Sequence, residues 1–401
     1  MKRTIAGLLC AALVGGAVFA QEVTFFNRLG STLVNQDLGG DAKFGNIYDR
    51  IQGQYESEKF SMWGRVQGTL QSTNGWDGDV ELDPVVHFNG AFRPVEFFEV
   101  ILGSNAGDEG LWGAAYLPGA YGYGTDASYG VRKWANGEGL TLAFKGAGVG
   151  LDGLNIGWNV LQPETLSEKV GDDTESRWQT GFGVSYVVPE LVGIGFGARI
   201  DTAKDANQEF GIYAELLAVE NLKASVGVSM NTDATVVTAA AVTDLKKRFE
   251  AAAVGEPTEA KFRAFLNAGV EYGFAGMDLP LTVGADIGLL AGADTVYENE
   301  SGDITIMPMI AGLWVKFDVT EQLWADLRVT YADSLAGGSH DDKYQCSHSL
   351  LKVTPRVHFA LSEADEFRLQ SNISTAFSKK DKSTTESQAG FDIGIYWQHN
   401  F

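Results

Sequence analysis

The chain has 401 residues, and its 52 Asp and Glu against 30 Lys and Arg give a formal net charge of −22. This acidity disfavours nucleic-acid binding, because phosphate contacts need a basic surface. With 49 glycines, 9 prolines and a mean hydropathy of −0.06, the chain has no apolar run after residue 20 that is long enough for a membrane helix. A helical membrane protein is therefore excluded. A membrane β-barrel is not, because its strands need only alternate between apolar and polar residues.

Residues 1–20 have the pattern of a secretory signal peptide. Two basic residues come first, an apolar run follows, and small residues precede the expected cut between Ala20 and Gln21. Cys10 raises the alternative of a lipoprotein, but the large leucine before it does not suit that processing site, so we interpret this cysteine as part of the apolar run. The mature chain, 21–401, is predicted to form a single domain.

The rest of the chain predicts β-strands joined in hairpins. Segments of about ten to fourteen residues alternate between apolar and polar positions, which is the period of a strand with two different faces. Short turns join the segments in pairs, and longer polar loops separate the pairs. The predicted strands are 22–34, 43–56, 60–71, 80–91, 95–104, 139–149, 153–161, 177–188, 191–201, 207–217, 221–231, 262–275, 279–290, 304–318, 321–332, 349–360, 365–377 and 388–401. They number about eighteen, or sixteen if 22–34 and one other ambiguous segment are not strands.

An all-β, antiparallel transmembrane barrel explains this pattern better than a water-soluble β-sandwich. A sandwich shows the same alternation, but the usual strand has only about five or six residues. The predicted short turns and long loops match the short periplasmic turns and long external loops of membrane barrels. The sequence therefore predicts a barrel whose lipid partner is the surrounding bilayer.

One face of the predicted strands carries charged side chains. A bare Arg or Lys facing lipid at mid-depth costs about 2–4 kcal/mol, so this face should meet water in a pore. The pore-lining candidates are Arg65, Asp326, Arg328, Lys352, Arg356 and Arg368. The alternative is that such charges form structural ladders between neighbouring strands. The sequence leaves open whether the two signs separate across the lumen.

The longest predicted loop, 105–138, is rich in aromatic residues. Trp112 and four tyrosines are many for a loop that stays in water, so we expect the loop to fold onto another surface. A later loop, 333–348, contains His340, Cys346 and two aspartates, but a solvated acidic loop explains them better than a metal site. No HExxH, GxSxG or CxxC pattern accompanies the histidines, so the sequence predicts no enzyme, no metal and no cofactor.

The last predicted strand, 388–401, alternates most clearly. Its apolar positions are Phe391, Ile393, Ile395, Trp397 and Phe401. A C-terminal amphipathic strand that ends in Phe resembles the insertion signal of bacterial outer-membrane β-barrel proteins. The resemblance implies a location in the outer membrane of a Gram-negative-type envelope. It also implies recognition by the barrel-assembly machinery, with Trp397 and Phe401 as parts of the signal.

The organisation of the chain also resembles that of general porins. The resemblance implies that loop 105–138 bends into the pore and narrows it, with Asp108, Glu109 and Asp126 facing a basic wall, and it suggests a homotrimer. Two alternatives stay open: a loop packed on the rim or on a neighbouring subunit, and an aromatic path for sugars. The sequence thus predicts a channel for passive diffusion of small hydrophilic solutes or ions. The alternative function is a surface-exposed structural or adhesin barrel that acts through its loops.

Overall fold

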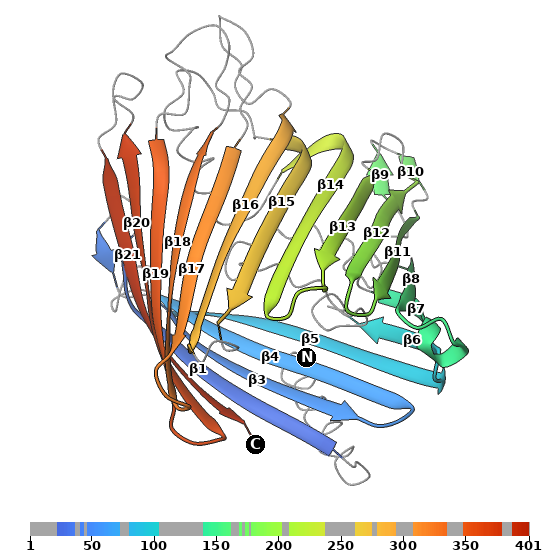
Figure 1. The fold of residues 1–401 in the computed structure, drawn as a ribbon, viewed down its shortest axis with the longest axis horizontal. Coiled ribbons are helices and arrows are strands. Elements are labelled where there is room, and N and C mark those ends of the chain that lie inside the picture. The colour runs from blue at the N-terminus through green and yellow to red at the C-terminus, as the bar shows by residue number, and fades with distance from the viewer. Residues whose placement is uncertain are drawn as a thin grey trace, which may run out of the picture.

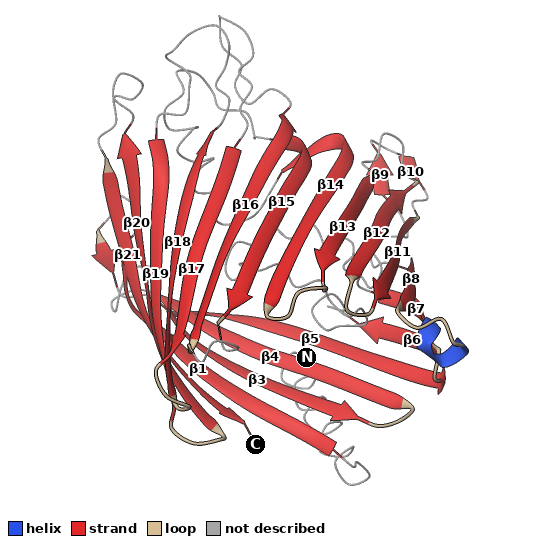
Figure 2. Cartoon of the chain, in the orientation of Figure 1, coloured by secondary structure: helices blue, strands red, loops and turns tan. Residues whose placement is uncertain are grey.

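In the part of the chain that it describes, the computed structural model consists almost entirely of β-strands (Figure 2). The described residues are 22–36, 41–43, 46–72, 80–103, 139–161, 168–170, 173–175, 178–202, 208–236, 261–274, 279–293, 308–334, 348–378 and 387–400. No helix within these ranges is long and apolar enough to cross a membrane.

Eighteen of the strands form one sheet wall. They are β1 (Glu22–Gln36), β3 (Asn46–Glu56), β4 (Phe60–Ser72), β5 (Val80–Val95), β6 (Phe98–Gly103), β7 (Gly139–Lys145), β8 (Leu154–Leu161), β11 (Gln179–Val188), β12 (Val192–Asp201), β13 (Glu209–Leu216), β14 (Leu222–Val236), β15 (Lys261–Gly273), β16 (Leu281–Ala293), β17 (Pro308–Asp318), β18 (Leu323–Ser334), β19 (His348–Ala360), β20 (Asp365–Ser378) and β21 (Gln388–Asn400). The short β2 (Ala42–Lys43) extends the pairing of β1, while β9 (Glu168–Val170) and β10 (Asp173–Glu175) form a separate ribbon.

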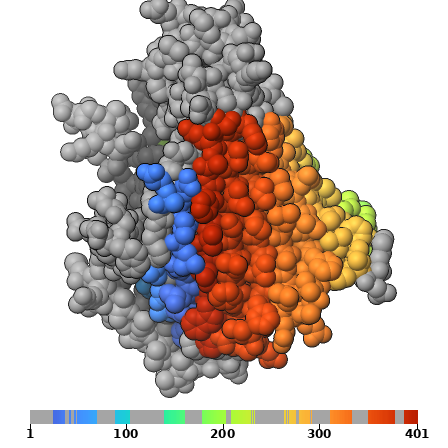
Figure 3. Space-filling view, turned by 90° about the vertical axis from the view of Figure 1, so that its left-hand side faces the viewer, coloured from blue at the N-terminus to red at the C-terminus, as the bar shows by residue number. Residues whose placement is uncertain are grey.

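The wall closes into an antiparallel barrel. Each of the eighteen strands pairs with the next along the chain, and β21 pairs with β1 from Phe26 opposite Asn400 to Gln36 opposite Phe391. Figure 3 shows the blue β1 directly against the red β21. Closure leaves no unpaired strand edge, which a membrane barrel requires. The prediction of an eighteen-strand barrel is confirmed, and the alternative of sixteen strands is wrong.

The strands are tilted. In Figure 1, β14 to β21 stand upright while β3 to β5 run across them. Strands on opposite walls of a barrel cross in projection because each strand tilts against the barrel axis by about 35–45°.

Several predicted strand boundaries differ from the structure, and two of these differences have a local cause. The strand predicted over 139–149 ends at Lys145, because Gly146–Val149 forms a short 3-10 helix that ends at Gly150 in a left-handed conformation. The turn predicted at 92–94 lies instead at residues 96 and 97, and β5 continues through Arg93. The side chain of Arg93 holds this extension in place by contacting Glu99 on the adjacent β6 and Glu56 on β3, which lies beyond β4.

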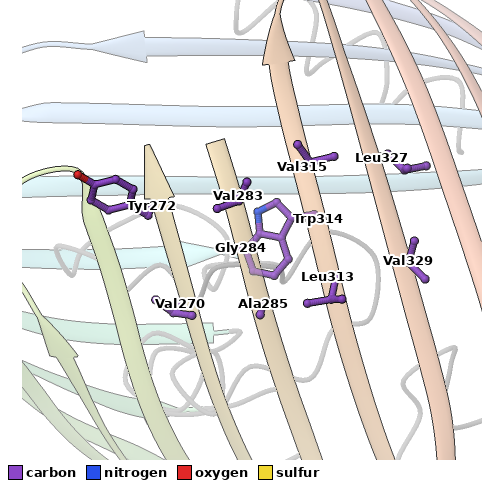
Figure 4. A pocket seen from close by; sticks show the side chains of 10 residues that line it. All are labelled: Val270, Tyr272, Val283, Gly284, Ala285, Leu313, Trp314, Val315, Leu327 and Val329. Carbon is purple, nitrogen blue, oxygen red and sulfur yellow. The ribbon is translucent and has the colours of Figure 1, made fainter. Parts of the chain in front are cut away.

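The outer face of the barrel is apolar. Alternate positions along the strands expose large apolar side chains, of which Leu313 is 63% exposed and Ile212 54%. On β15 to β18 this face has a groove of about 420 Å³, whose apolar lining includes Val270, Ala285 and Leu313 (Figure 4). Apolar side chains on the outside and polar ones on the inside are the pattern of a barrel whose solvent is lipid.

Candidate functional site in the barrel lumen

All six predicted pore-lining residues lie on the face opposite to the exposed apolar side chains, which is the lumen face. Arg65 is on β4, Asp326 and Arg328 are on β18, Lys352 and Arg356 are on β19, and Arg368 is on β20. Direct cross-strand pairing joins Asp326 to Arg356 and Thr330 to Lys352, so these residues share one face. Their role in conduction stays a prediction.

Neighbouring strands from β14 to β20 carry ion pairs on their lumen face, and we call this sector the ion-paired wall. Lys223 Nζ lies 3.1 Å from Glu271 Oε1, Arg328 Nη2 lies 2.8 Å from Asp286 Oδ2, and Arg356 Nε lies 3.3 Å from Asp326 Oδ1. His358 lies between two carboxylates, with Nδ1 2.9 Å from Glu366 Oε1 and Nε2 3.3 Å from Asp326 Oδ2. Asp326, Arg328 and Arg356 therefore take part in ion pairs between strands, as in the structural-ladder alternative.

Two tryptophans lie within the ion-paired wall. Figure 4 shows the indole of Trp314 beside Gly284, and a Cβ at Gly284 would lie only 2.0 Å from the Trp314 ring. Trp314 Nε1 donates to Glu271 Oε2 at 3.1 Å. The second indole, Trp324, stacks on His358 with 4.9 Å between ring centroids. Glycine at 284 thus makes room for the Trp314 ring to lie against the wall.

A pocket of about 540 Å³ opens along this wall. It is lined by Lys223, Glu271, Thr282, Trp314, Lys316, Trp324, Asp326, Arg328, Arg356, His358, Glu366 and Arg368. Five of these residues are Lys or Arg and three are Asp or Glu, so the lining carries more positive than negative charge. Such a polar concave surface suits hydrated ions and small polar solutes.

A second basic group lies beside the seam where the barrel closes. Arg28 on β1 is the direct cross-strand partner of Arg50 on β3, and Arg65 follows on β4. We call Arg28, Arg50 and Arg65 the arginine cluster. Of these three residues, only Arg65 was predicted to line the pore. Arg28 was missed because a bulge between Thr32 and Val34 breaks the alternation of β1, so its faces cannot be read from the pattern.

A third charged group lies near the turns that join β3 to β7. Glu99 is 2% exposed and contacts both Arg93 and Lys145, whose Nζ lies 3.1 Å from Glu99 Oε1. Arg93 also contacts Glu56. A carboxylate as deeply buried as Glu99 needs such partners, because an unpaired buried charge is costly. This group is therefore structural.

The remaining predicted site residues have these positions. Trp397 lies on the outer face, where its Nε1 donates to Asp365 Oδ1 at 3.1 Å. Ala20, Gln21, Asp108, Glu109, Asp126 and Phe401 fall outside the described residues, as do His340 and Cys346. Where the structure describes the chain, it contains no group of three His, Cys, Asp or Glu residues that could hold a metal ion.

Solved structures of outer-membrane proteins share this fold. OccAB4 of Acinetobacter baumannii is 10% identical, with 95% of this chain and 99% of that chain covered and a TM-score of 0.54. OccK1 (OpdK) of Pseudomonas aeruginosa is 11% identical, with the same coverage and a TM-score of 0.53. A structure of OpdK with vanillate is 12% identical, again with 95% and 99% covered and a TM-score of 0.53. No family model and no curated protein matches the sequence.

These findings establish the architecture. The chain is a closed β-barrel with the fold of outer-membrane porins, as the terminal strand and the hairpin pattern predicted. The predicted outer-membrane location agrees with this fold and with the apolar outer face.

Proposed function

We propose that the protein is a non-enzymatic, porin-like channel for passive diffusion of small hydrophilic solutes or ions across an outer membrane. The observation that carries the proposal is the lumen face of a closed eighteen-strand barrel, which is charged and polar and includes a pocket of about 540 Å³. Barrels of sixteen to eighteen strands are too wide for wall side chains alone to fill, so they leave an aqueous channel.

Loop 105–138 is the candidate constriction in this proposal. Asp108, Glu109 and Asp126 would then face the basic residues of the lumen and favour cations at the narrowest point. The support for this step is the resemblance to general porins together with the surplus of basic residues around the pocket. The loop lies outside the described residues, so a functional measurement has to test it.

The test is the single-channel conductance of the refolded mature chain in a planar bilayer, with reversal potentials in a salt gradient. We expect stepwise openings. We also expect the cation preference to weaken when Asp108, Glu109 and Asp126 are replaced together by Asn, Gln and Asn. A correctly folded barrel that passes no current would contradict the channel and return attention to the structural or adhesin alternative.

The partners in this proposal are the lipids of the outer membrane, the barrel-assembly machinery and two further copies of the chain. The terminal strand with Trp397 and Phe401 would be read by the assembly machinery. Chemical crosslinking in native membranes tests the homotrimer, and a ladder that stops at the monomer would contradict it.

A further inference from the structure

The arginine cluster brings three cationic side chains onto neighbouring strands of the lumen wall. Arg28 and Arg50 stand directly opposite each other across β1 and β3. Gln67 is the direct partner of Arg50, and Arg65 lies two residues from Gln67 on the same face of β4. Directly opposed Cβ atoms are about 5 Å apart and diagonal neighbours about 7–8 Å, and like charges at this spacing repel. The arrangement therefore opposes folding unless something offsets the repulsion.

Glutamines hold the cluster in place. Arg28 Nε donates to Gln398 Oε1 at 2.9 Å, Arg50 Nε donates to Gln67 Oε1 at 2.8 Å, and Arg65 Nε donates to Gln52 Oε1 at 3.2 Å. Arg50 has further contacts of its own. A glutamine oxygen orients a guanidinium group but carries no charge to neutralise it. The positive charge is thus fixed in position without being cancelled by these partners.

Arg28 and Arg65 differ in this respect from other arginines of the lumen. Arg199 Nη2 lies 2.6 Å from Glu209 Oε1, and Arg328 and Arg356 have aspartate partners. Among the described residues, neither Arg28 nor Arg65 forms an ion pair with a carboxylate. Both are half-buried in the wall. Within the described residues, no carboxylate therefore competes with a ligand for their guanidinium groups.

We propose that the arginine cluster is a binding site for a dianionic oxyanion, namely the phosphate group of free phosphate or of a small phosphate monoester. Guanidinium groups match phosphate oxygens in geometry and in charge. A phosphate dianion offsets more of the repulsion among three arginines than a single carboxylate does. The inference deepens the proposed function and rests on it in one respect, because an open lumen is what brings such a solute to the cluster.

The experiment measures phosphate binding in two ways on the refolded mature chain. Single-channel current in potassium chloride is recorded while inorganic phosphate replaces chloride at constant ionic strength, and calorimetry measures phosphate binding to the barrel in detergent. We expect saturable changes in both. Arg28→Gln and Arg65→Gln should each raise the half-saturating phosphate concentration about tenfold or more, because each removes a charge-assisted contact.

The matched control is Arg199→Gln, which removes a lumen arginine that is already paired with a carboxylate. It should leave phosphate binding unchanged. Arg28→Lys keeps the charge but not the planar fork, so it should fall between the native chain and Arg28→Gln. This second variant keeps the test decisive if Arg28→Gln does not fold, and heat-modifiable migration on a gel reports folding for all of them.

Some outcomes would overturn the proposal, and others would define the channel or the ligand that goes with the site. If acetate or chloride bound as tightly as phosphate, the effect would be one of general charge and not of a phosphate site. The same would follow if Arg199→Gln weakened phosphate binding as much as Arg28→Gln does. A channel that conducts but does not respond to phosphate would contradict the phosphate site and support the proposed channel. A barrel that passes no current but binds phosphate through Arg28 would contradict the proposed channel and support the phosphate site. Glucose 6-phosphate separates the two sources, since its binding supports the monoester and its failure to bind assigns the site to the free ion.

Discussion

The ion-paired wall and the arginine cluster are two parts of one lumen that use arginine in opposite ways. In the ion-paired wall, Arg356 contacts an aspartate on the adjacent strand, and Arg328 contacts one two strands away. In the arginine cluster, Arg28 and Arg65 are held by glutamines. The first arrangement cancels charge and ties strands together. The second keeps charge and orients it. The number of charged residues in the barrel therefore says little about the electrostatic potential in the lumen. That potential depends on whether each charge has a partner of opposite sign close by.

The comparison also separates stability from function. Removing one member of a buried ion pair leaves an uncompensated charge and destabilises the fold. Removing one member of a like-charge pair relieves repulsion. Substitutions of buried ion-paired residues and of the arginine cluster should therefore change the free energy of unfolding with opposite signs, which three variants can test.

The largest effect is expected for Glu99→Gln in the charged group near the β3–β7 turns. Glu99 is 2% exposed and contacts two cations, Arg93 and Lys145. Its neutral replacement leaves both cations without this partner, and we expect the free energy of unfolding to fall by about 3–5 kcal/mol. Urea unfolding of the refolded barrel in lipid vesicles measures it. The control is Glu321→Gln in the exposed β17–β18 turn, and an equal loss there would contradict the role of burial.

A smaller effect is expected for Asp286→Asn in the ion-paired wall. Its partner Arg328 is 5% exposed, and their contact of 2.8 Å joins β16 to β18 across the intervening β17. We expect a loss of about 2 kcal/mol, the usual size for a hydrogen bond between charged groups. The double variant Asp286→Asn with Arg328→Gln should recover part of this loss, because it also removes the arginine charge whose aspartate partner is gone. Full additivity of the two single variants would show that the pair is not coupled.

The sequence predicted the barrel because the evidence for it is local. Period-2 alternation and turn residues recur in each hairpin, so eighteen strands could be placed with errors mainly at their ends. The turn near Arg93 was misplaced because proline follows this residue, whereas the contact to Glu99 that keeps β5 extended depends on strand pairing. Turn chemistry is local and strand pairing is not, so the pairing decided the boundary.

The candidate sites could be predicted only in part, for the same reason. Arg65 was recognised as lumen-facing from the alternation of its own strand. The arginine cluster could not be recognised, because it requires the register that sets Arg28 opposite Arg50 and the closure that brings Gln398 to Arg28. Gln398 is 370 positions away from Arg28 in the sequence, and the residues around each of them do not indicate that the two side chains meet.

The smallest effect, and the one that separates the two regions most clearly, is expected for Arg28→Gln. The variant loses a hydrogen bond to Gln398 but relieves repulsion with Arg50, which stands directly opposite. We expect the free energy of unfolding to stay level or rise by up to about 1 kcal/mol in phosphate-free buffer. Arg199→Gln, which breaks the pair with Glu209, should be less stable than the native chain in the same assay. If Arg28→Gln were destabilised as much as Arg199→Gln, Arg28 would be a structural residue of the wall, and the difference between the two regions would disappear. Adding phosphate sharpens the result, because a ligand that binds only the folded barrel should stabilise the native chain more than Arg28→Gln.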